Sequence, residues 1–387
     1  MKNFLNNYEF TLTVKGPVHI GDGKTLTKVD YFFYKDRIYF PNLHKMFLYI
    51  KQMHLTSDYE SFMYSANNNL TYWLNDKRII SAVAEKCTDY SISLVGSSAS
   101  KPRNLSTFVK DPYGNPYIPG SSLKGLIRTL LLAKEIVDNP DNYAEIRNDI
   151  RRSINDPRKN IISNLYKASS TIPKAKRLEK IVDEAIKSKL NKASSTIEEI
   201  AFHKLNCSDK RKNAVNDVFK GLIVSDSQPL STNDLIVTEK IDYNVVGNEK
   251  PLPLYRESLV PNTQVKFNVT IDTSIFNYTI DDILQAVKLF AEDYYTYFSS
   301  NFRGIKKPTS NTVWLGGGAG YVSKTIMYNL FGDDAYNIVS SVLNVTAKQH
   351  HHDKDKKKGV SPVTVKLTKY NNTLCHYGEC TLSITEK

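Results

Sequence analysis

The chain has 387 residues, a formal net charge of +12 and 41% hydrophobic residues. This length excludes a protein made of a single small module, and the balance of apolar and charged residues excludes a disordered chain. The N-terminal segment lacks the apolar core of a signal peptide, and no stretch approaches the roughly 18 apolar residues of a transmembrane helix. We therefore expect a folded, cytoplasmic protein whose basic charge attracts polyanions, most often nucleic acid.

The first 120 residues alternate between strand patterns and turns. Residues 8–14 have the two-residue period of a strand, and a glycine-containing turn follows. Residues 29–40 predict a hairpin with its turn at residues 35–37. Residues 45–90 predict short helices. Residues 102–119 predict an extended segment that leads into a helix beginning near residue 120.

The sequence Tyr117–Leu132, YIPGSSLKGLIRTLLL, predicts the start of that helix. Its leucines and isoleucine recur at helical spacing and form one apolar face, made by Leu123, Leu126, Ile127, Leu130 and Leu131. Ser121 or Ser122 can cap the helix, and Lys124 and Arg128, four residues apart, project together from another side. A helix N-terminus with two nearby cations favours phosphate binding. A capped core helix with solvated cations is the alternative.

Residues 136–220 predict an inserted helical lobe, because lysine, glutamate, isoleucine and leucine recur there at helical spacing. Between residues 145 and 220 the chain has 18 Lys and Arg against 10 Asp and Glu, so much of the basic excess lies here. The hexapeptide KASSTI occurs at 167–172 and 192–197. After the second copy, Thr196 and Glu199 have the spacing of a capping box, which predicts a helix start.

A second β-rich domain begins near residue 221. Strand patterns occur at residues 221–230, 235–245, 256–272 and 363–370, with an amphipathic helix at 281–298. The histidine run 350–352 lies in a highly charged stretch, and Cys375, His376 and Cys380 lack a second cysteine pair. We therefore expect no metal site and no cofactor.

A glycine-rich loop is the second candidate site, formed by Gly316, Gly317, Gly318 and Gly320. The loop lacks the Gly-Lys-Ser/Thr end of a P-loop, and Tyr321 stands where a dinucleotide loop needs Gly or Ala. Its backbone, with Lys324 close behind, suits the phosphates of a polynucleotide, and Trp314 and Tyr321 could stack on bases. A tight structural turn is the alternative.

A nuclease would need a general acid and base. His19, in the turn after the first strand, is the best-placed histidine, but no partner lies at a fixed spacing from it. The sequence also lacks the H-E-x-x-H and G-x-S-x-G motifs. We therefore expect no catalytic residue and keep His19 as the candidate of the alternative, an endoribonuclease.

Four segments, in this order, resemble the RAMP superfamily of CRISPR-associated proteins: GPVHIGDG, YIPGSSLKGLIRTLL, RESLVPNTQVKFNVTI and VWLGGGAG. The set is most similar to the subunit that caps the 3′ end of the guide RNA in type III-A effector complexes. The resemblance implies an α+β fold of two ferredoxin-like (RRM-like) RAMP domains with a helical insertion. We place the domains at 1–220, with the insertion at about 136–220, and at 221–387.

The resemblance also implies a function. It predicts a non-catalytic RNA-binding subunit of an antiviral ribonucleoprotein, which binds the guide RNA (crRNA) and neighbouring RAMP backbone subunits and supports crRNA maturation, with a separate trimming nuclease as a further partner and no membrane. The RNA-binding residues that it implies are His19, Ser121, Ser122, Lys124, Arg128, Gly316, Gly317, Gly318, Gly320 and Lys324. The alternative is a metal-independent RAMP endoribonuclease that processes precursor crRNA with His19 as general acid or base. A scaffold that contacts only proteins is a third interpretation.

Overall fold

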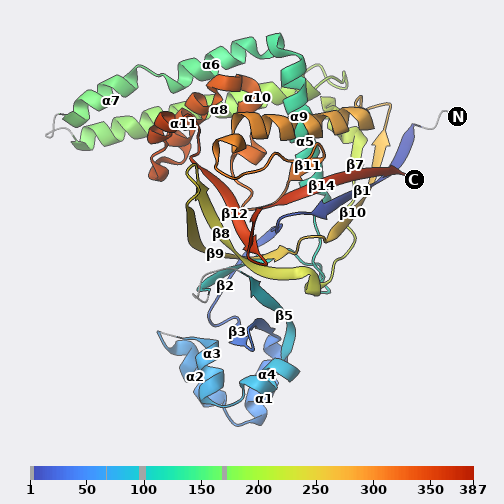
Figure 1. Ribbon diagram of the computed structural model, residues 1–387, viewed down its shortest axis with the longest axis vertical. Helices are drawn as coiled ribbons and strands as arrows, with labels where there is room; N and C mark the ends of the chain where they lie inside the picture. The colour runs from blue at the N-terminus through green and yellow to red at the C-terminus, as the bar shows by residue number, and fades with distance from the viewer. Residues whose placement is uncertain (1–3, 67, 96–101, 168–171) are drawn as a thin grey trace.

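The structure, a computed structural model, describes residues 4–66, 68–95, 102–167 and 172–387. The strands of these residues form a five-stranded sheet, here called sheet I, and a nine-stranded sheet, here called sheet II. Both sheets are curled, and helices cover one side of the molecule, while a small helical knob projects from the opposite end (Figure 1). The fold therefore mixes helices and strands, as the sequence predicts.

Sheet I is antiparallel, in the order β11-β14-β1-β10-β7. Its strands are β1 (Leu5–Val14), β7 (Leu222–Val224), β10 (Gln264–Asp272), β11 (Thr312–Trp314) and β14 (Glu379–Glu386). The predicted two-residue period of β1 is confirmed, because Phe10, Leu12 and Val14 are buried while their neighbours are more exposed. Since β1 pairs with β14, the two chain ends lie close together (Figure 1).

Sheet II has the path β2-β6-β9-β8-β5-β4-β3, with β12 joined to β8 and β13 joined to β12. Its strands are β2 (Gly21–Thr27), β3 (Phe32–Tyr34), β4 (Arg37–Pro41), β5 (Thr88–Val95), β6 (Asn104–Phe108), β8 (Leu235–Asn244), β9 (Glu249–Leu259), β12 (Thr364–Tyr370) and β13 (Thr373–His376). The β3–β4 turn has positive φ at Lys35 and Asp36, so the predicted hairpin is confirmed. The predicted domain boundary at residue 220 falls just before β7, and strands from both sides of it pair within each sheet.

Helix α5 (Gly120–Asp138) is central to the core. Its predicted apolar face is confirmed, since the five side chains at Leu123, Leu126, Ile127, Leu130 and Leu131 are all buried. The helix packs on α9 (Ile280–Tyr297) and on β7. Thr279 and Asp282 form a reciprocal capping box at the start of α9. Burial of each aliphatic side chain contributes about 1.5–3 kcal/mol, so this face fixes α5 firmly over the sheet.

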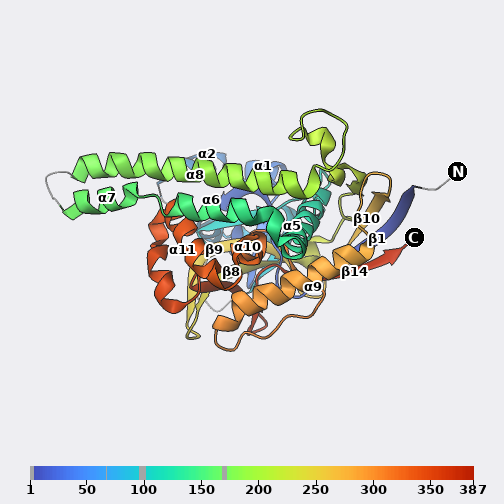
Figure 2. The same ribbon diagram turned by 90° about the horizontal axis from the view of Figure 1, so that it is seen from above.

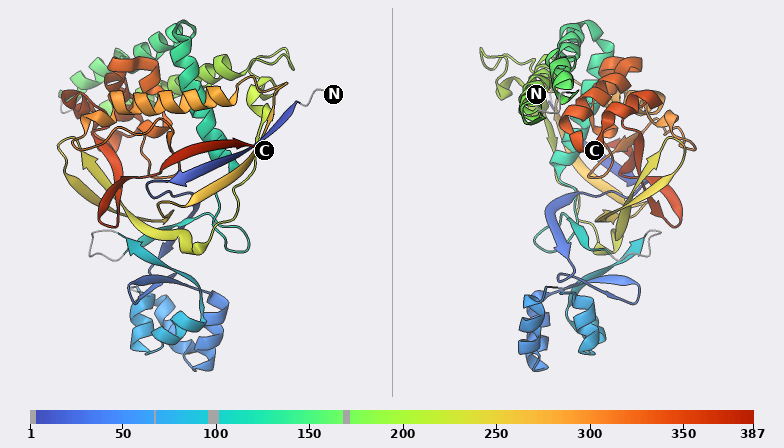
Figure 3. Two further views of the ribbon diagram at one scale, coloured as in Figure 1. Left: turned by 45° about the vertical axis from the view of Figure 1, so that its right-hand side comes forward. Right: turned by 90° about the vertical axis from the view of Figure 1, so that its left-hand side faces the viewer.

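The helical knob lies between β4 and β5. It consists of α1 (Leu43–Gln52), α2 (Thr56–Tyr64), α3 (Leu70–Asp76) and α4 (Ile80–Lys86), which agrees with the short helices predicted at 45–90. The knob has its own apolar cluster around Met46, Ile50, Trp73 and Leu74. Figure 3 shows it at the end of the molecule opposite the other helices, joined to the body by β3, β4 and β5.

The predicted helical lobe is formed by α6 (Ala144–Ile154), α7 (Arg158–Lys167) and α8 (Ile172–Phe202). Seen from above, α7 and α8 lie side by side along one edge of the molecule, next to α11 (Ala335–Thr346), which follows α10 (Met327–Phe331) (Figure 2). The predicted helix start at Thr196 is wrong: Thr196 lies inside α8 and its hydroxyl bonds back to the carbonyl of Lys192. Most of the first KASSTI copy lies outside the described residues. No helix in the described part of the chain has the length and apolar character that a membrane span requires.

Candidate nucleic-acid interface

The start of α5 is fixed by contacts with β7 and the segment after it. The N–H of Gly120 donates to the Asp226 carboxylate at 2.8 Å, and no side chain caps the helix at Pro119. A Cβ on Gly120 would lie 2.4 Å from the Ser225 carbonyl oxygen, so only glycine allows this approach. The prediction that Ser121 or Ser122 caps the helix is therefore wrong. Both serines lie within the first turn of α5.

The glycine-rich loop packs against the turn that follows β1. The Gly317 N–H donates to the carbonyl oxygen of His19 at 2.7 Å. Gly316 has φ 83°, and a Cβ there would lie 2.3 Å from the same oxygen. A Cβ on Gly318 would meet the guanidinium of Arg256. Glycine is required at these positions because the backbone lies directly on its neighbours.

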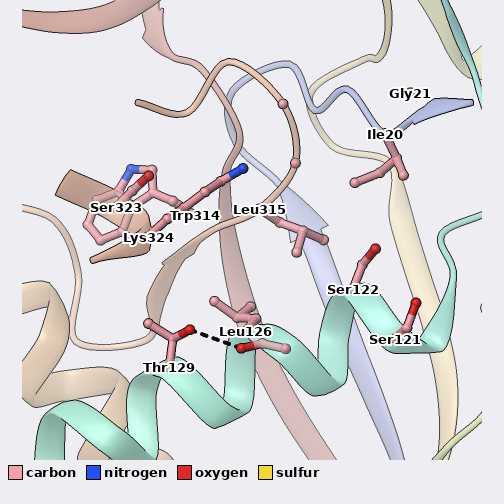
Figure 4. A pocket seen from close by; sticks show the side chains of 13 residues that line it. Ile20, Gly21, Ser121, Ser122, Leu126, Thr129, Trp314, Leu315, Ser323 and Lys324 are labelled. Atoms are coloured by element: carbon pink, nitrogen blue, oxygen red, sulfur yellow. Dashed lines mark hydrogen bonds between the residues drawn. The ribbon is translucent and has the colours of Figure 1, made fainter. Parts of the chain in front are cut away.

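Together these segments enclose a cavity of about 360 Å³. It is lined by Ile20, Gly21, Ser121, Ser122, Gly125, Leu126, Thr129, Trp314, Leu315, Gly316, Gly317, Ser323 and Lys324. Figure 4 shows the hydroxyl groups of Ser121 and Ser122 on one side and Trp314 and Lys324 on the other. Three segments that the sequence singles out, the first turn, the helix start and the glycine-rich loop, thus meet at one place.

The lining of this cavity contains no carboxylate. Lys324 lies at the end of a short 3₁₀ helix, Val322–Lys324, and is exposed. Although the residue as a whole is exposed, neighbouring atoms partly desolvate the Lys324 ammonium, and this desolvation together with the nearby charge of Arg256 lowers its pKa. Among the described residues neither cation forms a salt bridge, and Arg256 Nη1 is buried without a hydrogen-bond partner. Lys324 therefore brings to the cavity a positive charge that no carboxylate among the described residues pairs with, which favours an anionic ligand.

Arg128 requires a correction. Its Nε donates to Glu198 at 2.9 Å and its Nη1 to Asp217 at 2.8 Å. The guanidinium also lies over the rings of Phe202 and Phe219, 4.5 and 4.9 Å from their centroids. Arg128 therefore joins α5 to the end of α8 and to the segment before β7, and its charge is used within the protein.

Lys124 lies on the same side of α5 as Arg128. It is partly buried, and desolvation lowers the pKa of its ammonium although Asp217 lies nearby. Neither Lys124 nor Arg128 belongs to the cavity lining. The predicted pair of cations thus faces away from the glycine-rich loop, and the serines and Lys324 line the cavity instead.

His19 also differs from the prediction. Its side chain is buried, its Nδ1 donates to the Glu257 carbonyl at 2.6 Å, and its ring meets the edge of Phe108. Burial lowers the pKa of the imidazole to about 4, so the ring is neutral at pH 7 and lacks the second, imidazolium proton that a general acid gives up. The imidazole does not line the cavity. His19 therefore supports the glycine-rich loop through its backbone carbonyl.

Gly318 and Gly320 are likewise outside the cavity lining and shape the loop from within, both at positive φ. Among the described residues, no three His, Cys, Asp or Glu side chains come together as a metal site would require. His352 instead bonds to Asp355 at 2.7 Å.

The sequence predictions missed two charged residues beneath the site, Arg256 and Glu257. The fully buried Glu257 carboxylate accepts from Tyr90 Oη at 2.6 Å, from the Phe108 N–H at 2.7 Å and from Lys110 Nζ at 2.5 Å. The signal was present in the sequence Arg256–Leu259, RESL, where two charges interrupt a strand pattern. Its partners are distant in sequence, so the pattern alone could not identify them.

Comparisons with known proteins identify the family of the chain. A family model described as the RAMP superfamily matches residues 11–323. The "CRISPR system Cms protein Csm5" of Streptococcus thermophilus is 30% identical over 342 residues, 84% of this chain and 82% of that protein. The protein of the same name from Mycobacterium tuberculosis strain H37Rv is 27% identical and covers 99% of both chains.

Two solved structures share the fold. A chain in the cryo-EM structure of a Csm–crRNA–target RNA ternary complex of a type III-A CRISPR-Cas system has a TM-score of 0.63 at 22% identity, covering 97% of this chain and 100% of that one. The crystal structure of T. onnurineus Csm5 has a TM-score of 0.56 at 18% identity, covering 96% and 99%. These likenesses confirm the predicted α+β class of two RRM-like RAMP domains with added helices. By the family match and the identity to its relatives, this chain belongs to the RAMP superfamily.

Proposed function

We propose that the chain is an RNA-binding subunit of a type III-A CRISPR effector complex. It binds the 3′ part of the guide RNA through the RNA backbone and caps the filament of related backbone subunits. Its relatives are named as proteins of a CRISPR system, and one structural neighbour belongs to a type III-A complex with crRNA and target RNA. Neighbouring subunits and a separate trimming nuclease are the proposed partners, and the cytoplasmic location stays a prediction.

The cavity at the glycine-rich loop is the observation that carries this proposal. Its wall contains the hydroxyl groups of Ser121 and Ser122, the ammonium of Lys324, and the backbone of Gly316 and Gly317, which a ligand can approach closely because no Cβ stands there. Hydroxyl, backbone and lysine contacts bind phosphate and sugar oxygens without reading base identity. A guide-binding subunit needs this property because spacer sequences vary from one guide to the next.

The test is RNA binding by the purified chain as a function of salt. We expect a fluorescein-labelled oligoribonucleotide to bind with an affinity that falls steeply as salt rises. Lys324→Ala should weaken binding and reduce the slope by about one counterion. Lys288→Ala, at an exposed position of α9 outside the cavity lining, is the matched control. If Lys324→Ala and Lys288→Ala bind alike, the cavity is not the RNA site.

The same preparation separates the other interpretations. A protein-only scaffold would show no salt-dependent affinity for RNA. An endoribonuclease would cut a repeat-containing precursor RNA with and without EDTA, and His19→Ala would abolish the cutting. The buried, neutral His19 gives this outcome no support, so we expect intact RNA in both conditions.

A further inference from the structure

A second cavity lies beside the first and shares Trp314 with it. Its volume of about 410 Å³ is in the range of small-ligand pockets. The walls come from the end of α9, the segment 299–308, β13 and β11. Apart from Trp314, none of the residues that the sequence analysis connected with RNA lines it.

Two buried polar atoms in this wall lack a partner. Ser299 is 1% exposed and Trp314 is 3% exposed, yet neither Ser299 Oγ nor Trp314 Nε1 forms a hydrogen bond with any described residue. Folded proteins satisfy almost all such groups, because an unpaired buried donor costs about 1–3 kcal/mol. Both groups can donate, so they call for a ligand with hydrogen-bond acceptors.

The remaining lining adds aromatic side chains and positive charge. The rings of Tyr294 and Trp314 lie 4.1 Å apart between centroids, and the imidazole of His376 meets the edge of Tyr294. Lys306 and Lys307 are exposed at this cavity, and neither pairs with a carboxylate among the described residues. Glu379 is the one acid in the lining, and burial raises the pKa of its carboxyl group.

We propose that this cavity binds one nucleotide, with the base against Tyr294, Trp314 and Ser299 and the phosphate at Lys306 and Lys307. A base supplies a flat ring with acceptor atoms, and the phosphate supplies a negative charge that pairs with the two lysines. Because Trp314 borders both cavities, a strand held at the glycine-rich loop can place its next unpaired nucleotide here. Binding of a nucleotide that belongs to the guide strand rests on the proposed function, whereas binding of a free nucleoside monophosphate does not.

Photocrosslinking of the full chain tests both sources. One arm uses 4-thiouridine monophosphate, and the other uses an oligoribonucleotide that carries 4-thiouridine, with adducts mapped by mass spectrometry. We expect adducts within residues 299–308 or 373–376 in at least one arm. In that arm Ser299→Ala and the double variant Lys306→Ala/Lys307→Ala should lower affinity, the double variant by about tenfold. Both changes remove atoms without adding bulk, and the lysines are exposed, so folding should be retained.

The outcomes separate this inference from the proposed function. If the oligonucleotide binds but crosslinks only at residues 120–129 and 315–324, and all variants bind normally, the nucleotide pocket is refuted and the proposed function stands. If only the monophosphate binds and crosslinks at 299–308, the pocket stands without the proposed function. Absence of binding in both arms refutes both.

Discussion

The Gly317 N–H donates to the carbonyl oxygen of His19 at 2.7 Å, and this bond joins the glycine-rich loop to the turn after β1. The two segments come from opposite ends of the chain, yet they form one wall of the cavity with the start of α5. The strands that carry them meet in sheet I, where β1 and β11 both neighbour β14. The position of the site is thus a result of the sheet topology.

Alanine at two glycines should separate folding from RNA binding. Gly316→Ala places a methyl group 2.3 Å from the His19 carbonyl at φ 83°, so we expect a loss of at least about 2 kcal/mol in unfolding free energy. Gly125→Ala meets no atom within 4 Å and replaces a glycine inside α5, so it should stabilise by about 0.5–1 kcal/mol.

Gly125 also lines the cavity, and the added methyl group occupies space there. We therefore expect Gly125→Ala to raise the melting temperature and to weaken RNA binding. Calorimetry and fluorescence anisotropy on the same sample measure the two effects. A variant that is more stable and binds RNA as the parent does would place the RNA elsewhere.

Arg128 should matter for stability rather than for RNA. Arg128→Ala removes hydrogen bonds to Glu198 and Asp217 and the packing on two aromatic rings, so urea unfolding should show a loss of about 1–3 kcal/mol, since the site is partly exposed. When the variant is measured under conditions in which it is folded, the dependence of its RNA affinity on salt should be unchanged. A weaker dependence of RNA affinity on salt would show that Arg128 contacts the RNA.

Local patterns predicted most of the fold, and long-range contacts explain the errors at the site. The apolar face of α5 and the alternation of β1 depend on spacing alone, so periodicity identified them. The partners of Arg128 are 70 and 89 residues away in sequence. No local pattern could show that these carboxylates would neutralise it. In the same way Asp226, not a serine of the helix, binds the first N–H of α5.

Acid should destabilise the fold through His19, which is buried, and His376, which is half-buried. Burial lowers the pKa of His19 and of His376 to about 4, from 6.5. The unfolded chain therefore binds more protons between these values, and stability that is complete above pH 6.5 is lost as the pH falls toward 4. At pH 5 the loss should be roughly 2 kcal/mol for each histidine.

Urea unfolding at pH 7 and pH 5 measures this dependence. His19→Gln and His376→Gln should each reduce the difference between the two pH values, whereas His44→Gln, at an exposed position on α1, should leave it unchanged. Equal pH dependence in all three variants would mean that other groups cause the acid effect.

The buried Glu257 should contribute strongly to stability because three donors depend on its carboxylate. Glu257→Gln leaves Lys110 without its counter-charge, and it puts a donating NH2 group in the place of a carboxylate oxygen that accepted hydrogen bonds. We therefore expect a loss of about 3–5 kcal/mol in unfolding free energy. Glu9→Gln, which removes a more exposed pair with Lys266, should have a much smaller effect because solvent screens that pair. Lys110→Met combined with Glu257→Gln should cost less than the sum of the two single changes, because the lone charge is then gone. Additive losses in this double-mutant cycle, measured by urea unfolding, would show that the Lys110–Glu257 pair does not act as a unit.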